Sequence, residues 1–216
     1  MTAVPDEWTL GASDCPALLR GELPRLYDEA TGARPRRDLS GVLAVRLGQA
    51  TEPFHRAWFS ERTGLALRDP QRRLRLAGGP RLHATVDALL EDGTPFEGKF
   101  FSAWADLPRA ARWKAGQVQA QMLCAGAGRG VLSLITRDAT WAAGFVGPMP
   151  GVQDEILQRL DLLAWCVGHG ARPPALARWE IEAVPLTPIP DRCAEAAAAR
   201  RSGRVRAPSR TEESPR

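Results

Sequence analysis

The chain has 216 residues, of which 44% are hydrophobic and 25% are charged, and its formal net charge is +4. This length and hydrophobic content are enough for one sizeable core, so we expect a single domain with a short tail. The modest basic excess fits a polyanionic partner but does not require one.

The cysteines and the first residues exclude several classes of protein. Zinc ribbons and iron–sulfur proteins need closely spaced ligand pairs, and the chain has no C-x-x-C pair. The four cysteines lie far apart, at Cys15, Cys124, Cys166 and Cys193. The N-terminus lacks a basic start and an apolar core, and no apolar run reaches about 18 residues. We therefore expect a cytoplasmic protein with reduced thiols and no membrane span.

The first half of the chain predicts short helices followed by a hairpin. Residues 11–32 contain two short helical pieces, and Pro53 favours a helix that begins near Thr51 and ends at Gly64. Runs with β character follow at residues 66–76, 82–90 and 95–101. The Asp-Gly turn within residues 91–94 is a hairpin signal, so Asp87 and Glu97 are expected on adjacent antiparallel strands.

The second half predicts two helices and two strands. A loop is expected over residues 104–113, a helix over 114–126, strands over 131–135 and 140–146, and a helix over 153–169. This order predicts an α/β (α+β) core with one mixed central sheet flanked by helices. We expect residues 1–184 to form the domain and residues 185–216 to form a tail rich in Pro, Ala and Arg, with the last dozen residues disordered.

Lys99 is one of only two lysines in a chain rich in arginine. It lies two residues after Glu97, so on a strand both side chains point to the same face, while Phe96 and Phe100 point into the core. Two carboxylates supply hard oxygen ligands for a divalent cation, and a nearby ammonium helps to polarise water. Asp87, Glu97 and Lys99 therefore predict a metal-dependent phosphodiesterase site, with the backbone carbonyl of Gly98 or Phe100 as a further ligand.

Other residues are candidates for the edge of this site. Glu52 would complete a metal site or bridge to a second cation, and Gln117 or Gln119 would bind Lys99, water or a phosphate. A basic and aromatic stretch between the strand and the next helix would contact DNA through Trp104, Arg109, Arg112, Trp113 and Lys114.

Each of these interpretations has a structural alternative. A surface Glu–Lys pair on one strand face has the same pattern as Glu97 and Lys99. Glu52 also suits the N-terminus of a helix, and the tryptophans also suit the core or its rim. His55 and His83 lack paired ligand spacing and are expected to be packing or solvent residues.

The order of the motifs resembles the YqaJ-type viral recombinase family, the lambda-exonuclease-like branch of the PD-(D/E)xK nucleases. The resemblance covers about residues 10–170. It is carried by Gly11-Ala-Ser13-Asp14, Leu47-Gly-Gln-Ala-Thr-Glu52-Pro53, Thr63-Gly64, Ala84-Thr-Val-Asp87, Phe96-Glu97-Gly98-Lys99 and Gln117-Val-Gln-Ala-Gln-Met122. Val86 and Ala88 depart from the family pattern, but neither change removes a ligand.

The resemblance implies a restriction-endonuclease-like core that uses Mg²⁺ or Mn²⁺ to degrade one strand of a DNA duplex end in the 5′ to 3′ direction. By position it implies that Asp87 and Glu97 bind metal, Lys99 is the catalytic lysine and Glu52 is the helix acid. It also makes Gln117 the active-site glutamine and places Ser13 and Asp14 near the bound strand end. The resemblance also implies a single-strand annealing protein as a partner and assembly of the chain into a ring-shaped homotrimer.

Two alternative functions stay open. An endonuclease or repair nuclease of the same core would act on a different DNA structure. A non-catalytic DNA-binding phage accessory protein would retain the fold without the chemistry.

Overall fold

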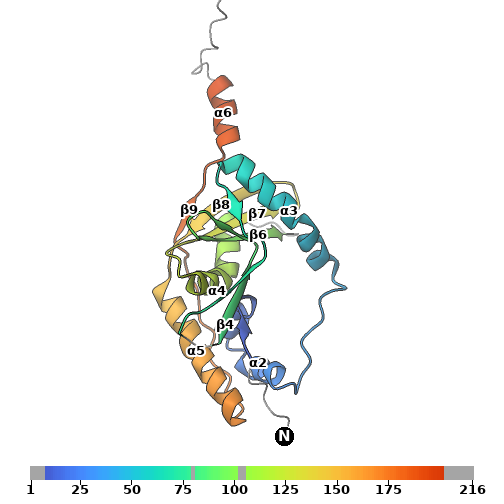
Figure 1. Cartoon of the computed structure of the whole chain (residues 1–216), viewed down its shortest axis with the longest axis vertical. Helices are drawn as coiled ribbons and strands as arrows, with labels where there is room; N and C mark the ends of the chain where they lie inside the picture. The colour runs from blue at the N-terminus through green and yellow to red at the C-terminus, as the bar shows by residue number, and fades with distance from the viewer. Residues whose placement is uncertain (1–7, 79–80, 102–105, 202–216) are drawn as a thin grey trace, which may run out of the picture.

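The computed structural model describes residues 8–78, 81–101 and 106–201. Its strands form two sheets (Figure 1). The smaller sheet has the order β1-β4-β3, and the larger has the order β2-β5-β6-β7-β8-β9. The strands are β1 (Leu10–Gly11), β2 (Leu67–Arg68), β3 (Arg72–Arg75), β4 (Leu82–Val86), β5 (Ala88–Leu90), β6 (Pro95–Phe101), β7 (Gly130–Thr136), β8 (Trp141–Val146) and β9 (Leu186–Pro188). The helices are η1 (Ala12–Asp14), α1 (Cys15–Leu19), α2 (Leu23–Ala30), α3 (Leu43–Thr63), α4 (Leu107–Ala125), α5 (Pro150–His169) and α6 (Arg192–Arg201).

The centre of the larger sheet is a β6–α4–β7 unit. β6 and β7 are parallel, as expected for strands joined by a crossover helix, and Glu97 lies opposite Leu132 in their register. Side chains alternate along β6, so Phe96 packs on Phe59 of α3 while Phe101 joins the cluster beneath α4. The sheet is therefore covered by α3 on one face and by α4 on the other, which confirms the predicted α/β core.

The predicted strand over residues 82–90 is divided at Asp87. β4 pairs with β1 and β3 in the smaller sheet, whereas β5 pairs with β2 and β6 in the larger one. The β5–β6 hairpin is confirmed, but Asp87 lies at the junction before β5 rather than within a continuous strand. The predicted strand over residues 66–76 is divided in the same way into β2 and β3. Asp69 and Gln71 between them have positive φ angles of 50° and 58°.

Three helices begin earlier than the sequence indicates: α5 by three residues, and α3 and α4 by more. α3 starts at Leu43, with Pro53 inside it, so the predicted start near Thr51 is wrong. Pro53 has no N–H to donate to the backbone carbonyl of Gln49, four residues earlier. The first two turns of α3 are largely exposed, so water can bind this carbonyl instead. α4 starts at Leu107, because Asp106 caps it by accepting a 2.8 Å hydrogen bond from the backbone N–H of Arg109. The predicted loop over residues 104–113 is therefore helical from residue 107, and residues 102–105 lie outside the described chain.

The C-terminal region continues the fold past residue 184. β9 pairs with β8, and α6 follows it. The predicted domain limit at residue 184 stays a prediction, and the disorder expected for the last dozen residues concerns positions outside the described chain.

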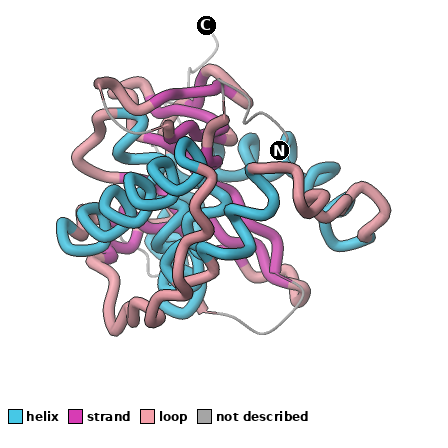
Figure 2. Tube along the Cα trace, turned by 90° about the horizontal axis from the view of Figure 1, so that it is seen from below, coloured by secondary structure: helices cyan, strands magenta, loops and turns pink. Residues whose placement is uncertain are grey.

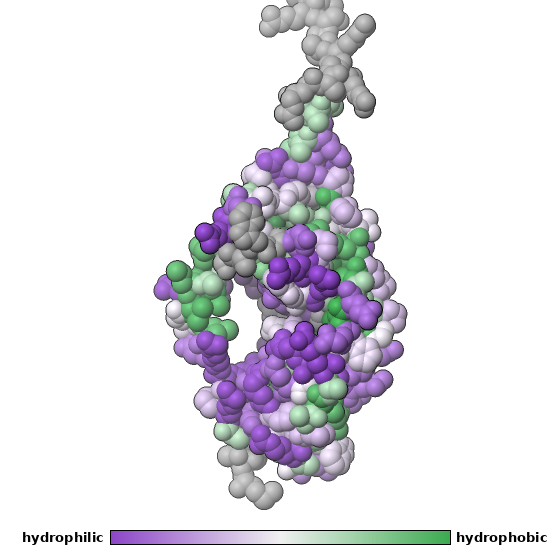
Figure 3. All heavy atoms as spheres, turned by 180° about the vertical axis from the view of Figure 1, so that it is seen from behind, coloured by the Kyte–Doolittle hydropathy of each residue, from purple (hydrophilic) through white to green (hydrophobic). Residues whose placement is uncertain are grey.

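The segment between α2 and α3 protrudes from the body of the molecule (Figures 1 and 2). Seen from behind, an opening separates this region from the body, and hydrophobic side chains gather on it (Figure 3). Its exposed apolar residues include Leu39 and Val42, and Leu43 and Leu47 follow in the first turns of α3. Within the described ranges, no helix is long and apolar enough to cross a membrane.

His55 connects α3 to strand β7 of the larger sheet. Its side chain is 3% exposed, and its Nε2 lies 2.8 Å from Oγ of Ser133, which also accepts a 3.0 Å hydrogen bond from Nε1 of Trp141. Burial, with a contribution from Lys99, lowers the pKa of His55 from 6.5 to about 4. The expectation of a packing histidine is confirmed for this residue.

This pKa predicts a loss of stability in acid. Between pH 6.5 and about pH 4 the unfolded chain takes up a proton at His55 while the folded chain does not, so the free energy of unfolding falls as the pH falls. The full effect is about 3 kcal/mol. Urea denaturation at pH 7 and pH 5 should show a smaller pH dependence for His55→Gln than for the wild type. His169→Gln, at an exposed position, is the control and should behave like the wild type.

Candidate active site

Glu97 is a buried carboxylate with 1% of its surface exposed. Its Oε1 forms an ion pair with Nζ of Lys99 and accepts a 2.5 Å hydrogen bond from Nε2 of Gln117. Its Oε2 accepts a hydrogen bond from Nε2 of Gln121. Because a buried charge is costly without partners, these three donors from β6 and α4 are what allow Glu97 to lie beneath the helix.

Asp87 lies beside Glu97 at the junction of the two sheets. The pairing of Ala88 with Phe96 in the hairpin brings the two acids together, and Oδ2 of Asp87 accepts a 2.8 Å hydrogen bond from the backbone N–H of Gly98. Burial and the charge of Glu97 raise the pKa of Asp87 to about 7, although Lys99 and the Gly98 hydrogen bond oppose this shift. The site therefore holds two repelling carboxylates at close quarters.

Lys99 lies on the same face of β6 as Glu97, as the strand alternation predicts. Burial alone would lower the pKa of Lys99, but the charges of Glu97 and Asp87 outweigh it and raise the pKa above its usual value. Lys99 is therefore a permanent ammonium at neutral pH. Its side chain is 28% exposed, so the charge reaches the surface beside the buried acids.

Lys114, the second lysine of the chain, lies near the first. It precedes Gln117 by three residues on α4, so both side chains lie on the same side of the helix. Burial and the charge of Lys99 lower the pKa of Lys114. The sequence analysis assigned Lys114 to a DNA path, and the structure places it close enough to Lys99 and Glu97 for their charges to act on it.

Gln71 is a residue of this site that the sequence analysis missed. Its Nε2 donates a 2.8 Å hydrogen bond to Glu52 and lies 3.5 Å from Oδ1 of Asp87. Gln71 lies in the short turn between β2 and β3, where it has a positive φ angle. No sequence motif marks this turn. Glu52 is thus next to the acid pair, but the amide of Gln71 lies between them.

The two other glutamines of α4 differ in whether they reach the acids. Gln119, predicted to bind DNA, is fully buried, and it donates to the carbonyl of Gly147 while accepting hydrogen bonds from Met149 and Gln153. This prediction is wrong, because a side chain that joins α4 to the start of α5 cannot reach a ligand. Gln121, which the sequence analysis did not single out, contacts Glu97. The spacing of 117 and 121, one helical turn, is the signal that would have found it.

The N-terminal candidates Ser13 and Asp14 have other surroundings than the acids within the described residues. Asp14 forms an ion pair with Arg36, and Ser13 is exposed on η1. In the part of the chain that the structure describes, neither makes a hydrogen bond or ion pair with Asp87, Glu97 or Lys99. Their contact with a strand end stays a prediction.

Arg109, Arg112 and Trp113 lie on α4 and line a cavity beside α1. Trp113 packs against Phe101 with ring centroids 5.6 Å apart, and Arg109 lies over its indole. Trp104 lies outside the described residues.

The carboxylate oxygens of Asp87 and Glu97 are suitable ligands for a divalent cation. Two buried carboxylates repel each other, and a cation between them would relieve that repulsion. Among the described residues, only Gln71 contacts Oδ1 of Asp87, at 3.5 Å. Within the described ranges, no group of three His, Cys, Asp or Glu side chains is arranged to hold a metal ion. A cation here would therefore need backbone carbonyl oxygens or water as further ligands.

Comparisons with known proteins identify the fold. No family model matches the sequence, and no curated protein does. An alkaline exonuclease from Laribacter hongkongensis, LHK-Exo, has a TM-score of 0.60 at 16% identity, over 75% of this chain and 89% of that one. Its complex with dAMP has a TM-score of 0.59 at 15% identity, over 75% and 89% of the two chains. A phage-related exonuclease from Haemophilus somnus 129PT has a TM-score of 0.61 at 10% identity, over 76% and 95%. The chain has the fold of these exonucleases, so the predicted restriction-endonuclease-like core is confirmed.

The contacts of Glu97 predict that Gln121→Leu destabilises the protein. The substitution leaves one oxygen of a buried carboxylate without its donor, which should lower the free energy of unfolding by about 2 kcal/mol. Urea denaturation of the metal-free protein at pH 7 measures the change. Gln117→Leu is the matched control, and its effect should be smaller because Gln117 is only half-buried and water can replace it. Equal stability of Gln121→Leu and the wild type would contradict the assigned role.

Proposed function

We propose that the chain is a metal-dependent deoxyribonuclease, a phosphodiester hydrolase that degrades duplex DNA from an end in the 5′ to 3′ direction. The observation that carries the proposal is the convergence of Asp87, Glu97 and Lys99 at one edge of β6. The shared fold with exonucleases supports the same chemistry. A phage or prophage recombination system is the proposed setting, in which the product strand passes to an annealing protein.

Each residue of the site has a proposed role that follows from its charge and position. Lys99 orients the attacking water and stabilises the negative charge that develops on the phosphate oxygens. Gln117 and Gln121 hold Glu97 in place from α4. Lys114 adds a second positive charge beside the phosphate. Because Lys99 stays protonated, it acts as an electrostatic group rather than as the base that accepts a proton.

Asp87 and Glu97 are proposed to hold Mg²⁺ or Mn²⁺, with Glu52 as an outer contributor. When bound, the cation would lower the pKa of water and neutralise charge on the scissile phosphate. Glu52 would approach it only after Gln71 gives up its hydrogen bond to that carboxylate.

The remaining details of the proposal come from the resemblance of the motifs. They are the polarity of degradation, the annealing partner and assembly into a ring-shaped trimer. An endonuclease of the same core would cut a covalently closed circle, whereas the proposed exonuclease requires a free end. Digestion of linear and circular duplexes with Mg²⁺ separates these two functions.

Lys99→Ala should lower DNA hydrolysis by at least about 100-fold, because it removes the cation that acts on the transition state. Lys99→Arg should also be strongly impaired, since a planar guanidinium does not fit beside Glu97 as a compact ammonium does. Release of label from a linear duplex with Mg²⁺ measures both. Arg129→Ala is the control and should keep the wild-type rate, because Arg129 lies in the loop after α4 and pairs with Asp92. If Lys99→Arg hydrolyses DNA at the wild-type rate, another residue must be the catalytic cation.

Asp87→Asn and Glu97→Gln should weaken cation binding, because each replaces a charged oxygen ligand by a neutral amide. Isothermal titration of the DNA-free protein with Mn²⁺ should show a loss of affinity of at least about 10-fold for each. Glu52→Gln should have the smaller effect. A wild-type affinity in both main variants would place the metal elsewhere.

A further inference from the structure

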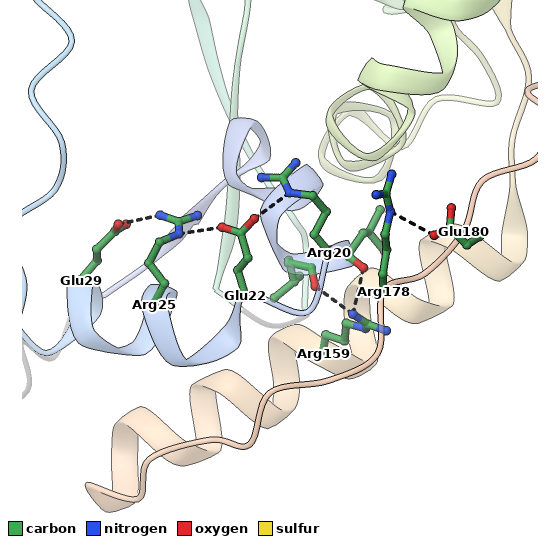
Figure 4. Close-up of polar contacts among 9 residues, drawn as sticks. Arg20, Glu22, Arg25, Glu29, Arg159, Arg178 and Glu180 are labelled. Carbon is green, nitrogen blue, oxygen red and sulfur yellow. Dashed lines mark hydrogen bonds and ion pairs between the residues drawn. The ribbon is translucent and has the colours of Figure 1, made fainter.

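A cavity of about 540 Å³ lies between α1, α4 and the segment of residues 178–182. Four arginines and two tryptophans from three separate parts of the chain line it: Arg20, Arg109, Arg112, Trp113, Arg178 and Trp179. Figure 4 shows the side chains of Arg20 and Arg178 beside the cavity, with Arg20 joined to Glu22 and Arg178 joined to Glu180. None of these six side chains belongs to the buried hydrophobic clusters, so packing of the core does not account for their being together.

The wall opposite α4 is held in place by backbone contacts. The N–H of Trp179 donates a 2.8 Å hydrogen bond to the carbonyl of Leu19 at the end of α1. Arg159 of α5 is 6% exposed and donates to the carbonyls of Leu18, Leu19 and Ala177, which joins the same two segments (Figure 4). The cavity is thus a preformed site rather than a gap between loose loops.

The charge of the cavity favours an anionic ligand. Arg20 pairs with Glu22 and Arg178 pairs with Glu180, so acids already compensate these two arginines. Arg109 and Arg112 are exposed and pair with no carboxylate in the described part of the chain. Glu182 also lines the cavity, but the arginines outnumber the glutamates, and planar guanidinium groups suit phosphate oxygens.

The aromatic residues favour a ligand with a flat ring. Trp113 is 45% exposed and Trp179 is 38% exposed, although both are large apolar side chains. Phe101 and the guanidinium of Arg109 already contact the Trp113 ring, so a ligand would meet the part of the indole that stays exposed. Bases of an unpaired strand stack on such rings, whereas paired bases are already stacked within the duplex.

The cavity begins close to the proposed active site. Glu97, Lys99 and Phe101 share one face of β6, and Phe101 contacts Trp113. Two residues along a strand span about 7 Å. Two stacked nucleotides of one strand also span about 7 Å, since each adds about 3.4 Å. A strand bound at Lys99 would therefore reach Trp113 within a few nucleotides.

We propose that this cavity binds an unpaired stretch of the DNA strand next to the active site, with a base on Trp113 or Trp179 and phosphates on Arg109 and Arg112. This inference rests on the proposed function for the origin of the strand. A free mononucleotide has the same chemistry, and the experiment distinguishes it from a strand.

The test is the fluorescence anisotropy of a labelled oligothymidylate with the full chain in EDTA, which measures binding without hydrolysis. Arg112→Ala and Trp179→Ala should each raise Kd by about 10-fold, as stacking and phosphate contacts predict. Arg112→Ala should also reduce the slope of log K against log salt by about 0.7. Arg129→Ala and Trp165→Ala are the matched controls, because both residues are exposed and neither lines the cavity. They should bind within twofold of the wild type.

Unchanged oligonucleotide binding by Arg112→Ala and Trp179→Ala, with thermal unfolding like the wild type, would overturn the inference. Competition by dAMP provides the second arm. If the variants lose dAMP binding but keep oligonucleotide binding, the cavity holds a free nucleotide and the strand assignment is wrong. Failure of the proposed function has a different outcome. The wild type would then not hydrolyse DNA with Mg²⁺, while Arg112→Ala and Trp179→Ala would still bind the oligonucleotide more weakly than the wild type.

Discussion

Burial of the Glu97 carboxylate is the constraint on which the site depends. A charge beneath a helix is tolerated only when donors replace the lost water, and Lys99, Gln117 and Gln121 supply them. These donors require β6 and α4 to pack at a fixed register, so the same contacts that orient the acid also join the central strand to its covering helix. Asp87 adds a second buried carboxylate, which makes the metal-free arrangement electrostatically unfavourable.

The sequence predicts the parts of the site that follow from local geometry. Strand alternation places Glu97 and Lys99 on one face, and the Asp-Gly turn predicts the hairpin that brings Asp87 near them. The break between β4 and β5 is not predictable in this way, because the run over residues 82–90 looks continuous while its halves pair with different sheets. Gln71 was missed for a similar reason, since only tertiary packing places its amide between Glu52 and Asp87. Gln121 lies one helical turn after Gln117, so helix periodicity could have placed it beside Glu97, whereas Gln119 lies on another side of α4.

Close approach of α1 to α4 creates the arginine-lined cavity from distant segments. A Cβ atom on Gly116 would lie 2.8 Å from Cδ1 of Leu19, so a larger residue would separate the two helices. At the other wall, Gly21 has a φ angle of 81°, and a Cβ atom there would lie 2.0 Å from the carbonyl oxygen of Leu176. Two glycines therefore set the width of the cavity, while Arg159 holds the ends of its walls together.

The chain has only two lysines, and they lie close enough together for the charge of Lys99 to act on Lys114. Amine-directed acylating reagents consequently have few targets in this protein: the α-amino group, Lys99 and Lys114. The ammonium of Lys99 is held in its charged form by two carboxylates, whereas the pKa of Lys114 is lowered, so the neutral amine needed for acylation is more abundant at Lys114. Covalent labelling of side-chain amines would therefore report on this one region of the surface, and a reporter group attached to Lys114 would monitor its occupancy directly.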